Sequence, residues 1–430
     1  MKITSKCLIC KGRNCLKYCG KQNCETCRRL QTKFMVASNI KQEFSAESPA
    51  PFIGRFGYPD INVGVLSAPD NSANASSNSS GNILDASLYD APRVWSANNY
   101  NIPSLVDIRS SLVNSRTNFN VRDARSTQKL SAKMLEVTQD VGMSSKPVDI
   151  EVKLKKVPTP KLHFFDINAP MGPTAQLKNL TETSNPNIDS RVWKVVDSYD
   201  LKAQDAINEL YNKSDSFDEN FLSKILSVGM LGAKTQRKLV PTRWSITATD
   251  DIIAKQLITE IKDFPVYDYV AYFGGYLGNY YLILFFPEVW SYELFEMYSP
   301  NGGVQDGKIQ FSTDYENYFG RKEYAEQCAG GYYTVRLGIL ERLKQLKRQG
   351  SVLALRFMTD DYSVPLGVWV TREATRKSVS NKPIVFGSKE LLLNYAKIFA
   401  KKKFGMELGQ VFGKSRLLAG MKQQKLVDYI

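Results

Sequence analysis

The chain has 430 residues, of which 43% are hydrophobic, so it can form two or three domains that each bury a core. Its longest apolar stretch, residues 276–290, contains Asn279 and falls short of the roughly 20 residues that cross a bilayer, so we expect no membrane span. The net charge of +14 sits at the two ends. Residues 1–33 hold nine basic side chains against one acidic, and residues 389–430 hold nine against three. Basic ends suit a protein that approaches a polyanion, but they are also ordinary solubilising surface.

The first 33 residues are dense in cysteine. The chain reaches these cysteines before any apolar run of signal-peptide length, so we expect a cytoplasmic protein. In a reducing compartment, two Cys-x-x-Cys pairs are typical of a structural zinc site, because each pair lets two thiolates converge on one ion. A disulfide-bonded head and redox-active thiols, including an iron–sulfur cluster, are the alternatives. The six cysteines are Cys7, Cys10, Cys15, Cys19, Cys24 and Cys27.

Apolar periodicity predicts the elements of the first half of the chain. Residues 67–82 are nearly free of apolar side chains and are expected to form an exposed loop. Residues 126–141 carry apolar side chains at spacings of three and four, which predicts a helix. Residues 148–154 alternate as a half-buried strand does.

In the second half of the chain, the pattern predicts short strands interspersed with helices. A helix is expected over residues 251–264, and strands over 267–273, 280–286 and 294–298, with glycine turns that favour an antiparallel meander. The remaining predicted elements are a helix over 332–349 stopped by Gly350, strands over 352–358 and 366–371, and a helix over 389–404 with Ser388 as N-cap and Gly405 as C-terminal glycine.

These elements predict an α+β fold with mixed, largely antiparallel sheets and packed helices, preceded by a small zinc-binding head. Neighbouring strands are too close in the chain for the helical crossovers of a doubly wound fold. The predicted organisation is a head over residues 1–33, an N-terminal domain over 34–240, a C-terminal α+β domain over 241–415 and a tail over 416–430.

The last eight residues fit the motif by which proteins bind the replication sliding clamp. Gln423 is followed by Leu426 at i+3 and by Tyr429 and Ile430 at i+6 and i+7. One turn of 3₁₀ helix would place the three apolar side chains on one side, while the glutamine bonds the rim of a pocket. The alternative is a tail helix that packs on its own domain. We predict a sliding clamp as partner.

Several strings in the chain resemble the archaeal Nre family, which is associated with DNA repair and sliding-clamp binding. The resemblance runs from the cysteine head to the terminal motif. In the family's head, a Cys-x-x-Cys pair, a Cys-Gly and a further cysteine recur, which implies Cys7, Cys10, Cys19 and Cys24 as metal ligands; Cys15 and Cys27 depart from that pattern. The four strings are GRFGYPDINVGVL (54–66), LVPTRWSITATDD (239–251), AGGYYTVRLGILE (329–341) and PLGVWVTRE (365–373).

Arginines interleaved with aromatic residues suggest a pocket that stacks a base and clamps a phosphate. Arg336 lies on the apolar side of its predicted helix, and a buried guanidinium needs an anion. That anion is either an internal carboxylate, such as Glu341 or Glu373, or the phosphate of a nucleotide. The nucleotide-binding candidates are Arg55, Tyr58, Trp244, Tyr332, Tyr333, Arg372 and Arg376.

Asp250 and Asp251 begin the predicted 251–264 helix, where carboxylates commonly cap free N–H groups. Otherwise they are candidates for general base work or for binding a divalent metal ion, with Asp60 as an outlying third. Together with Arg243 and Arg336 they form the predicted catalytic set. The single histidine, His163, excludes histidine-triad chemistry, and no GxxxxGK phosphate loop followed by serine or threonine is present.

The sequence therefore predicts a DNA repair protein tethered to the sliding clamp. Its expected substrate is damaged or blocked nucleic acid, and its expected reaction is hydrolytic removal of an AMP or ADP-ribose type adduct from a strand end. The first alternative is a non-catalytic DNA-binding adaptor that recruits repair factors to the clamp. A weaker alternative is an RNA-processing factor whose zinc head binds RNA.

Overall fold

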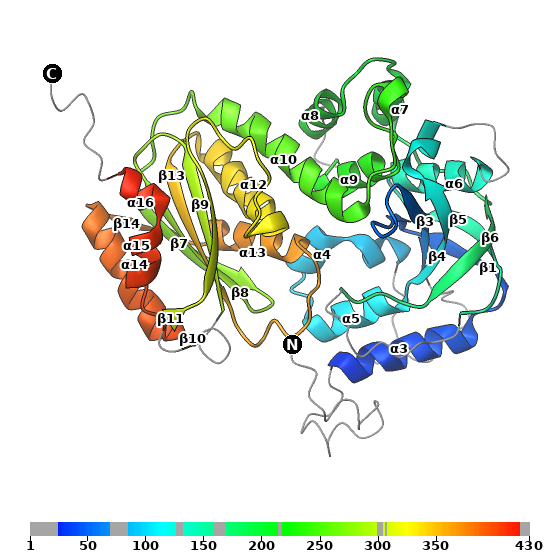
Figure 1. The fold of residues 1–430 in the computed structure, drawn as a ribbon, viewed down its shortest axis with the longest axis horizontal. Coiled ribbons are helices and arrows are strands. Elements are labelled where there is room, and N and C mark those ends of the chain that lie inside the picture. Colours follow the sequence, from blue (N-terminus) through cyan, green and yellow to red (C-terminus); the bar gives the residue numbers. More distant parts are fainter. Residues whose placement is uncertain are drawn as a thin grey trace. The chain divides into compact units, whose positions relative to one another are not determined.

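The computed structural model describes residues 25–68, 85–125, 132–158, 169–213, 217–298, 304–305 and 308–421. Two compact units make up the chain (Figure 1). Unit 1 comprises Met1–Ile252 with Val364–Leu366, and unit 2 comprises Ile253–Ser363 with Gly367–Ile430. The predicted exposed loop over 67–82, the zinc-binding head and the clamp motif lie wholly or largely outside the described residues.

Unit 1 is built on a six-stranded sheet in the order β1-β5-β6-β4-β3-β2. Neighbouring strands are antiparallel except β4 and β6, which run parallel. The predicted strand over 148–154 is confirmed as β5, with Val148, Ile150 and Leu154 buried on one face. The strands are β1 (Glu43–Ser48), β2 (Ala50–Ile53), β3 (Asp60–Ser67), β4 (Val113–Asn120), β5 (Val148–Leu154) and β6 (Thr174–Glu182).

Helix α6 (Ala132–Met143) covers this sheet, and its Val137 and Val141 share a buried apolar cluster with β5 and β6. It confirms the predicted 126–141 helix from residue 132 onward. The other helices of unit 1 are α3 (Glu25–Asn39), α4 (Pro92–Ala97), α5 (Ile102–Ser111), α7 (Ser190–Asp197), α8 (Ala203–Lys213) and α9 (Glu219–Ser227), with short 3₁₀ turns at Ala86–Asp90, Val121–Arg125 and Lys234–Gln236.

Unit 2 holds a second six-stranded sheet, in the order β12-β9-β13-β8-β7-β14, and a small ribbon of β10 (Val304–Gln305) and β11 (Lys308–Ile309). All pairs in the large sheet are antiparallel except β13 and β9. Its strands are β7 (Tyr269–Tyr276), β8 (Asn279–Phe286), β9 (Ser291–Tyr298), β12 (Phe311–Glu316), β13 (Ser351–Met358) and β14 (Ile384–Phe386).

The predicted meander is right for β7 and β8, which form an antiparallel hairpin, and wrong for β9. Strand β13 lies between β8 and β9 and pairs with both. All eight residues of β13 are buried. A strand buried on both faces reads as a continuous apolar run and belongs in the middle of a sheet, so a later strand displaces β9 from its neighbour in sequence.

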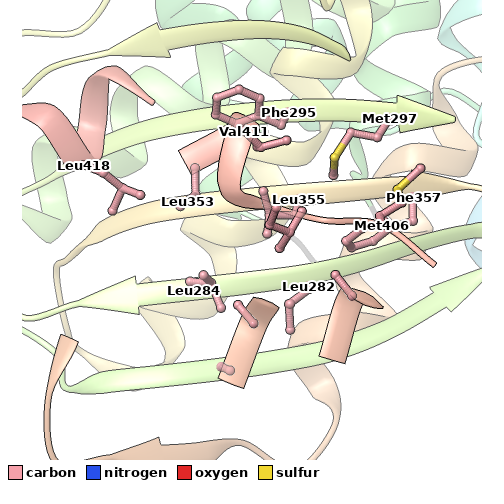
Figure 2. Close-up of a cluster of buried hydrophobic side chains, with 14 of the residues drawn as sticks. Leu282, Leu284, Phe295, Met297, Leu353, Leu355, Phe357, Met406, Val411 and Leu418 are labelled. Carbon is pink, nitrogen blue, oxygen red and sulfur yellow. The ribbon is translucent and has the colours of Figure 1, made fainter. Parts of the chain in front are cut away.

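Helices cover both faces of this sheet. Alternation along each strand sends one set of side chains to α12 (Ala329–Leu346) and α13 (Trp369–Ser380), and the other set to the C-terminal helices. Figure 2 shows the second set, in which Leu284, Leu353 and Phe295 belong to one buried apolar cluster with Val411 and Leu418. The C-terminal helices are α14 (Lys389–Phe404), α15 (Gly409–Lys414) and α16 (Arg416–Gly420).

The predicted ends of α14 are confirmed: the Ser388 hydroxyl accepts a hydrogen bond from the Leu391 amide, and Gly405 is left-handed with φ 66°. Two other predictions in unit 2 are wrong. Helix α12 ends at Leu346 with Lys347 in the left-handed region, rather than at Gly350. Residues 366–371 form no strand, because helix α13 begins at Trp369. Six residues rich in β-branched side chains are too few for periodicity to separate a strand from a buried helix.

The fold is α+β with mixed sheets, as predicted. Within the described ranges, no helix combines the length and the apolar character that crossing a membrane requires.

Asp140 gives unit 1 a pH-dependent stability. Burial, followed by the charges of Glu182 and Glu136, raises the pKa of Asp140 to about 7. Between about pH 4 and pH 7 the folded protein then holds a proton that the unfolded chain has released, so stability falls as pH rises through this window. We expect Asp140→Asn to remove this decline and, after allowance for solvent screening, to stabilise the protein by about 1 to 2 kcal/mol at pH 8. Urea denaturation at pH 4 and pH 8 measures the effect; a gain that does not grow with pH contradicts it.

Candidate nucleic-acid interface

An exposed group of aromatic and basic side chains lies on unit 1, on the turn between β2 and β3 and at the start of helix α10 (Thr242–Ile261). The rings of Tyr58 and Trp244 lie 5.5 Å apart, tilted by 50°. Tyr58 is 51% exposed and Trp244 is 45% exposed. Two of the predicted nucleotide-binding residues, 186 positions apart in the chain, thus form one open aromatic surface.

Backbone contacts hold this surface in place. The Ile53 amide donates to the Thr242 hydroxyl over 3.1 Å, which joins the end of β2 to the start of α10. The Asp60 amide donates to the Gly57 carbonyl over 2.9 Å and closes the turn that carries Tyr58. Gly57 has φ 86°, and a Cβ there would lie 2.6 Å from the Asp60 carbonyl oxygen, so the turn requires glycine.

Two arginines lie close to Tyr58 and Trp244 in the chain. The Arg55 guanidinium lies over the Phe56 ring at 4.8 Å, and Arg243 is exposed on the first turn of α10. Within the described part of the chain, neither pairs with a carboxylate. Phe56, which is 71% exposed, was not among the predicted site residues. Its position between Arg55 and Gly57 in the GRFGYP string was the available signal. We call Arg55, Phe56, Tyr58, Arg243 and Trp244 the aromatic–basic surface; π faces beside guanidinium groups can stack bases and neutralise phosphates.

The candidates on α12 do not form an open pocket. Arg336 is 1% exposed, and its Nη1 atom donates to Glu316 Oε2 over 2.7 Å. Trp290 Nε1 donates to the other oxygen of Glu316 over 3.1 Å. The anion that Arg336 needs is therefore an internal carboxylate, but it is Glu316 rather than Glu341 or Glu373. Tyr332 and Tyr333 are buried around the same guanidinium.

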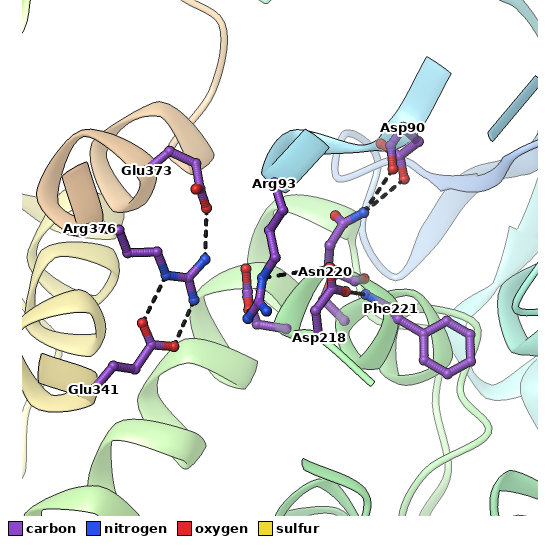
Figure 3. Close-up of polar contacts among 10 residues, drawn as sticks. Asp90, Arg93, Asp218, Asn220, Phe221, Glu341, Glu373 and Arg376 are labelled. Atoms are coloured by element: carbon purple, nitrogen blue, oxygen red, sulfur yellow. Dashed lines mark hydrogen bonds and ion pairs between the residues drawn. The ribbon is translucent and has the colours of Figure 1, made fainter. Parts of the chain in front are cut away.

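The candidates on α13 are similarly engaged. Arg376 donates to both oxygens of Glu341 at 2.8 and 2.7 Å and to Glu373 at 2.7 Å (Figure 3). These bonds tie α13 to α12. Arg372 is 2% exposed. A guanidinium clamped by two carboxylates holds helices together and offers little to a phosphate.

Asp250 and Asp251 do not cap a helix. Helix α10 begins at Thr242, where the Pro241 carbonyl accepts the first bonds, so both carboxylates lie more than two turns inside it. Adjacent helix positions diverge by about 100°, and Asp250 is fully buried whereas Asp251 is partly exposed. Among the described residues, no group of three or more potential metal ligands occurs.

Cys328, the seventh cysteine, is buried in unit 2, where its amide donates to the Asp314 carboxylate over 2.7 Å. Burial, together with the charges of Glu296 and Asp314, raises the pKa of its thiol far above the ordinary value. Cys328 is also 4% exposed, and a buried thiol that stays protonated is a poor nucleophile. The other site predictions, at Cys7, Cys10, Cys19 and Cys24 and at Gln423, Leu426, Tyr429 and Ile430, fall outside the described residues.

Two family models match the chain. The model for the N-terminal part of archaeal Nre proteins matches residues 18–303, and the model for the C-terminal part matches residues 316–429. The chain therefore belongs to the archaeal Nre family, which confirms the resemblance seen in its sequence. No solved structure matches the chain.

Curated relatives cover most of its length. The chain is 33% identical over 390 residues to DNA repair protein NreA of Archaeoglobus fulgidus, which spans 90% of this chain and 91% of the relative. It is 30% identical over 426 residues to DNA repair protein NreB of the same organism, spanning 99% of this chain and all of the relative. It is 32% identical over 340 residues to DNA repair protein NreA of Haloferax volcanii, spanning 77% of each chain.

Proposed function

We propose that this chain is a DNA repair protein that binds unpaired nucleic acid through the aromatic–basic surface of unit 1. The names of its relatives support the repair role. The observation that carries the binding role is the open pair of Tyr58 and Trp244 beside Arg55 and Arg243. Bases can stack on such rings only where they are splayed from a duplex, so single strands and strand ends are the expected ligands.

Loss of either ring should weaken binding. Stacking is worth about 1 to 3 kcal/mol per base, so Tyr58→Ala and Trp244→Ala are each expected to weaken single-strand binding by about 5- to 150-fold. Fluorescence anisotropy with a labelled single-stranded oligonucleotide measures the change. Trp193→Ala is a matched control, because Trp193 is a 42% exposed tryptophan on α7 of the same unit.

The same titration separates the alternatives. Equal affinity of wild type and both aromatic variants would remove the binding role from this surface. Tight binding to single-stranded RNA with none to DNA would favour the RNA-processing alternative.

Arg243→Ala is expected to reduce the slope of log affinity against log salt concentration, since one phosphate contact is lost.

Hydrolysis of an AMP or ADP-ribose adduct at a strand end is the proposed reaction. The aromatic–basic surface offers exposed rings on which an adenine could stack and guanidinium groups that could hold its phosphate. Incubation of the protein with end-labelled adenylated or ADP-ribosylated DNA, with and without a divalent metal ion, tests this. Binding without turnover on any of these substrates would leave the adaptor role, in which the protein only recruits other factors.

The proposed partner is the sliding clamp, engaged by Gln423, Leu426, Tyr429 and Ile430. Leu426, Tyr429 and Ile430 have the spacing with which clamp-binding motifs insert three apolar side chains into one pocket. Replacing all three apolar residues with alanine should abolish association with the clamp in a calorimetric titration. Unchanged association would refute the tether.

The proposed role of the cysteine head is to bind one structural zinc ion through four thiolates. Six cysteines within 21 residues supply more than enough ligands of the preferred type. Such a short segment cannot build a core of its own, so the metal would supply its folding free energy. Metal analysis of the purified protein should give one zinc per chain.

A further inference from the structure

Helix α14 of unit 2 exposes apolar side chains that its own fold leaves uncovered. Its inner face is buried against the sheet through Leu392, Ala396 and Ala400. On the outer face, Leu391 is 57% exposed and Ile398 is 59% exposed. These two lie seven residues apart, which is two helical turns, so they share one line along the helix. The two aliphatic side chains give this otherwise polar helix face a short apolar line that a partner could cover.

The same face is basic. Lys401 and Lys402 are exposed on the last turn of α14, whereas Lys397 lies further round the helix with its ammonium over the Phe412 ring. Lys401 pairs with Glu407, but both side chains are 69% exposed. Lysines at a helix C-terminus also complement the helix dipole, which explains the charge and leaves Leu391 and Ile398 unexplained. A partner that satisfies both features is a protein surface with apolar side chains and acidic groups.

The last described residues of the chain lie on the same face of the sheet as α14. Glu293 of β9 accepts hydrogen bonds from the Arg416 amide over 3.0 Å and the Leu417 amide over 3.1 Å, and it also bonds the Ser415 hydroxyl. This fastens α16 to the sheet face that α14 covers, and Met421 packs on the same apolar cluster. The nine residues 422–430 can reach at most about 30 Å from that point. A partner held by the tail would therefore be held close to α14.

We infer that the outer face of α14, formed by Leu391, Ile398, Lys401 and Lys402, is a second docking surface for the ring that the tail is proposed to engage. This inference rests on the proposed clamp tether and adds a folded contact to it. Two contacts joined by a short linker act together, because the first raises the effective concentration of the second. In this arrangement the tail inserts its apolar side chains into a pocket of the clamp, and the contact through α14 sets the orientation of the protein on the clamp.

Titration of the intact protein against the clamp tests the inference. Ile398→Glu and the double variant Lys401→Glu/Lys402→Glu are each expected to weaken binding by about tenfold or more, since each opposes an apolar or a charge contact. All three side chains are exposed, so the variants should fold, and their thermal unfolding should match wild type. Val289→Glu is the matched control, as Val289 is a 51% exposed aliphatic residue of unit 2 outside α14.

The outcomes separate the inference from the tether. If the α14 variants bind the clamp as wild type does while the alanine-substituted tail does not, the inference fails and the tether stands. If the tail variant binds unchanged, the tether fails. The inference also fails if the α14 variants lose only nucleic-acid binding, or if they change only self-association in sedimentation experiments, because the face would then serve a strand or a second copy of the chain.

Discussion

Replacing Arg336 with methionine is expected to lower the free energy of unfolding by about 3 to 5 kcal/mol. The guanidinium and the Glu316 carboxylate are both buried and lie 2.7 Å apart. Removing one partner of a buried ion pair leaves the other charge without compensation, which costs far more than the pair itself contributes. Urea denaturation followed by tryptophan fluorescence measures the loss, and Trp290, which donates to Glu316, reports from the site.

The double variant Arg336→Met/Glu316→Gln is the control. Glutamine keeps an acceptor for Trp290 and carries no charge, so this variant should regain most of the stability that Arg336→Met loses. A loss below about 1 kcal/mol for Arg336→Met would contradict a buried structural pair and would reopen a catalytic role for this arginine.

Replacing Glu293 with leucine is expected to destabilise unit 2 by about 2 to 4 kcal/mol and to release α16 from the sheet. The carboxylate is fully buried and accepts bonds from Ser415, Arg416 and Leu417. Leucine leaves these donors without an acceptor, and each unsatisfied buried donor costs about 1 to 3 kcal/mol. Hydrogen exchange of the Arg416 and Leu417 amides, with denaturation of the whole protein, measures both effects.

Glu293→Gln separates the acceptor from the charge. Burial raises the pKa of Glu293, so the ionised form carries a penalty that glutamine avoids while it retains one acceptor oxygen. We expect Glu293→Gln to change stability by less than about 1 kcal/mol near neutral pH. Rapid exchange at Arg416 and Leu417 in this variant, equal to that of the leucine variant, would show that the charge and not the acceptor holds α16.

Local pattern predicted the elements that are long or strictly periodic. Strand β5 and helix α14 with both its ends follow from alternation and capping residues alone. The order of strands in unit 2 does not, because β13 reaches its place between β8 and β9 from more than 50 residues further along the chain. The apolar character of β13 favours a central place in the sheet, but no local signal says which two strands flank it.

For the candidate site too, the sequence predicted some features and not others. An arginine on the apolar side of a helix correctly predicts a buried guanidinium that needs an anion, as Arg336 shows. Its partner could not be predicted, because Glu316 belongs to a strand whose position depends on the whole sheet. The early start of α10 was hidden by β-branched residues that weaken helical periodicity before Asp250. Arg336 and Asp250, two of the predicted catalytic residues, are both buried in the folded protein.

The surface on unit 1 shows what residue type can predict without structure. Arginine and aromatic residues alternate around Arg55, Tyr58, Arg243 and Trp244, and the fold brings the rings of Tyr58 and Trp244 within 5.5 Å. The Ile53 to Thr242 hydrogen bond, between residues 189 positions apart, joins the two segments that carry these side chains.

Photochemical cross-linking of the intact protein to a single-stranded oligonucleotide, followed by peptide mass spectrometry, tests the central claim most directly. We expect adducts on the peptides that carry Phe56, Tyr58 and Trp244, and their loss when an unlabelled single strand competes. Adducts confined to other peptides, with none on these, would contradict the assignment of nucleic-acid binding to this surface.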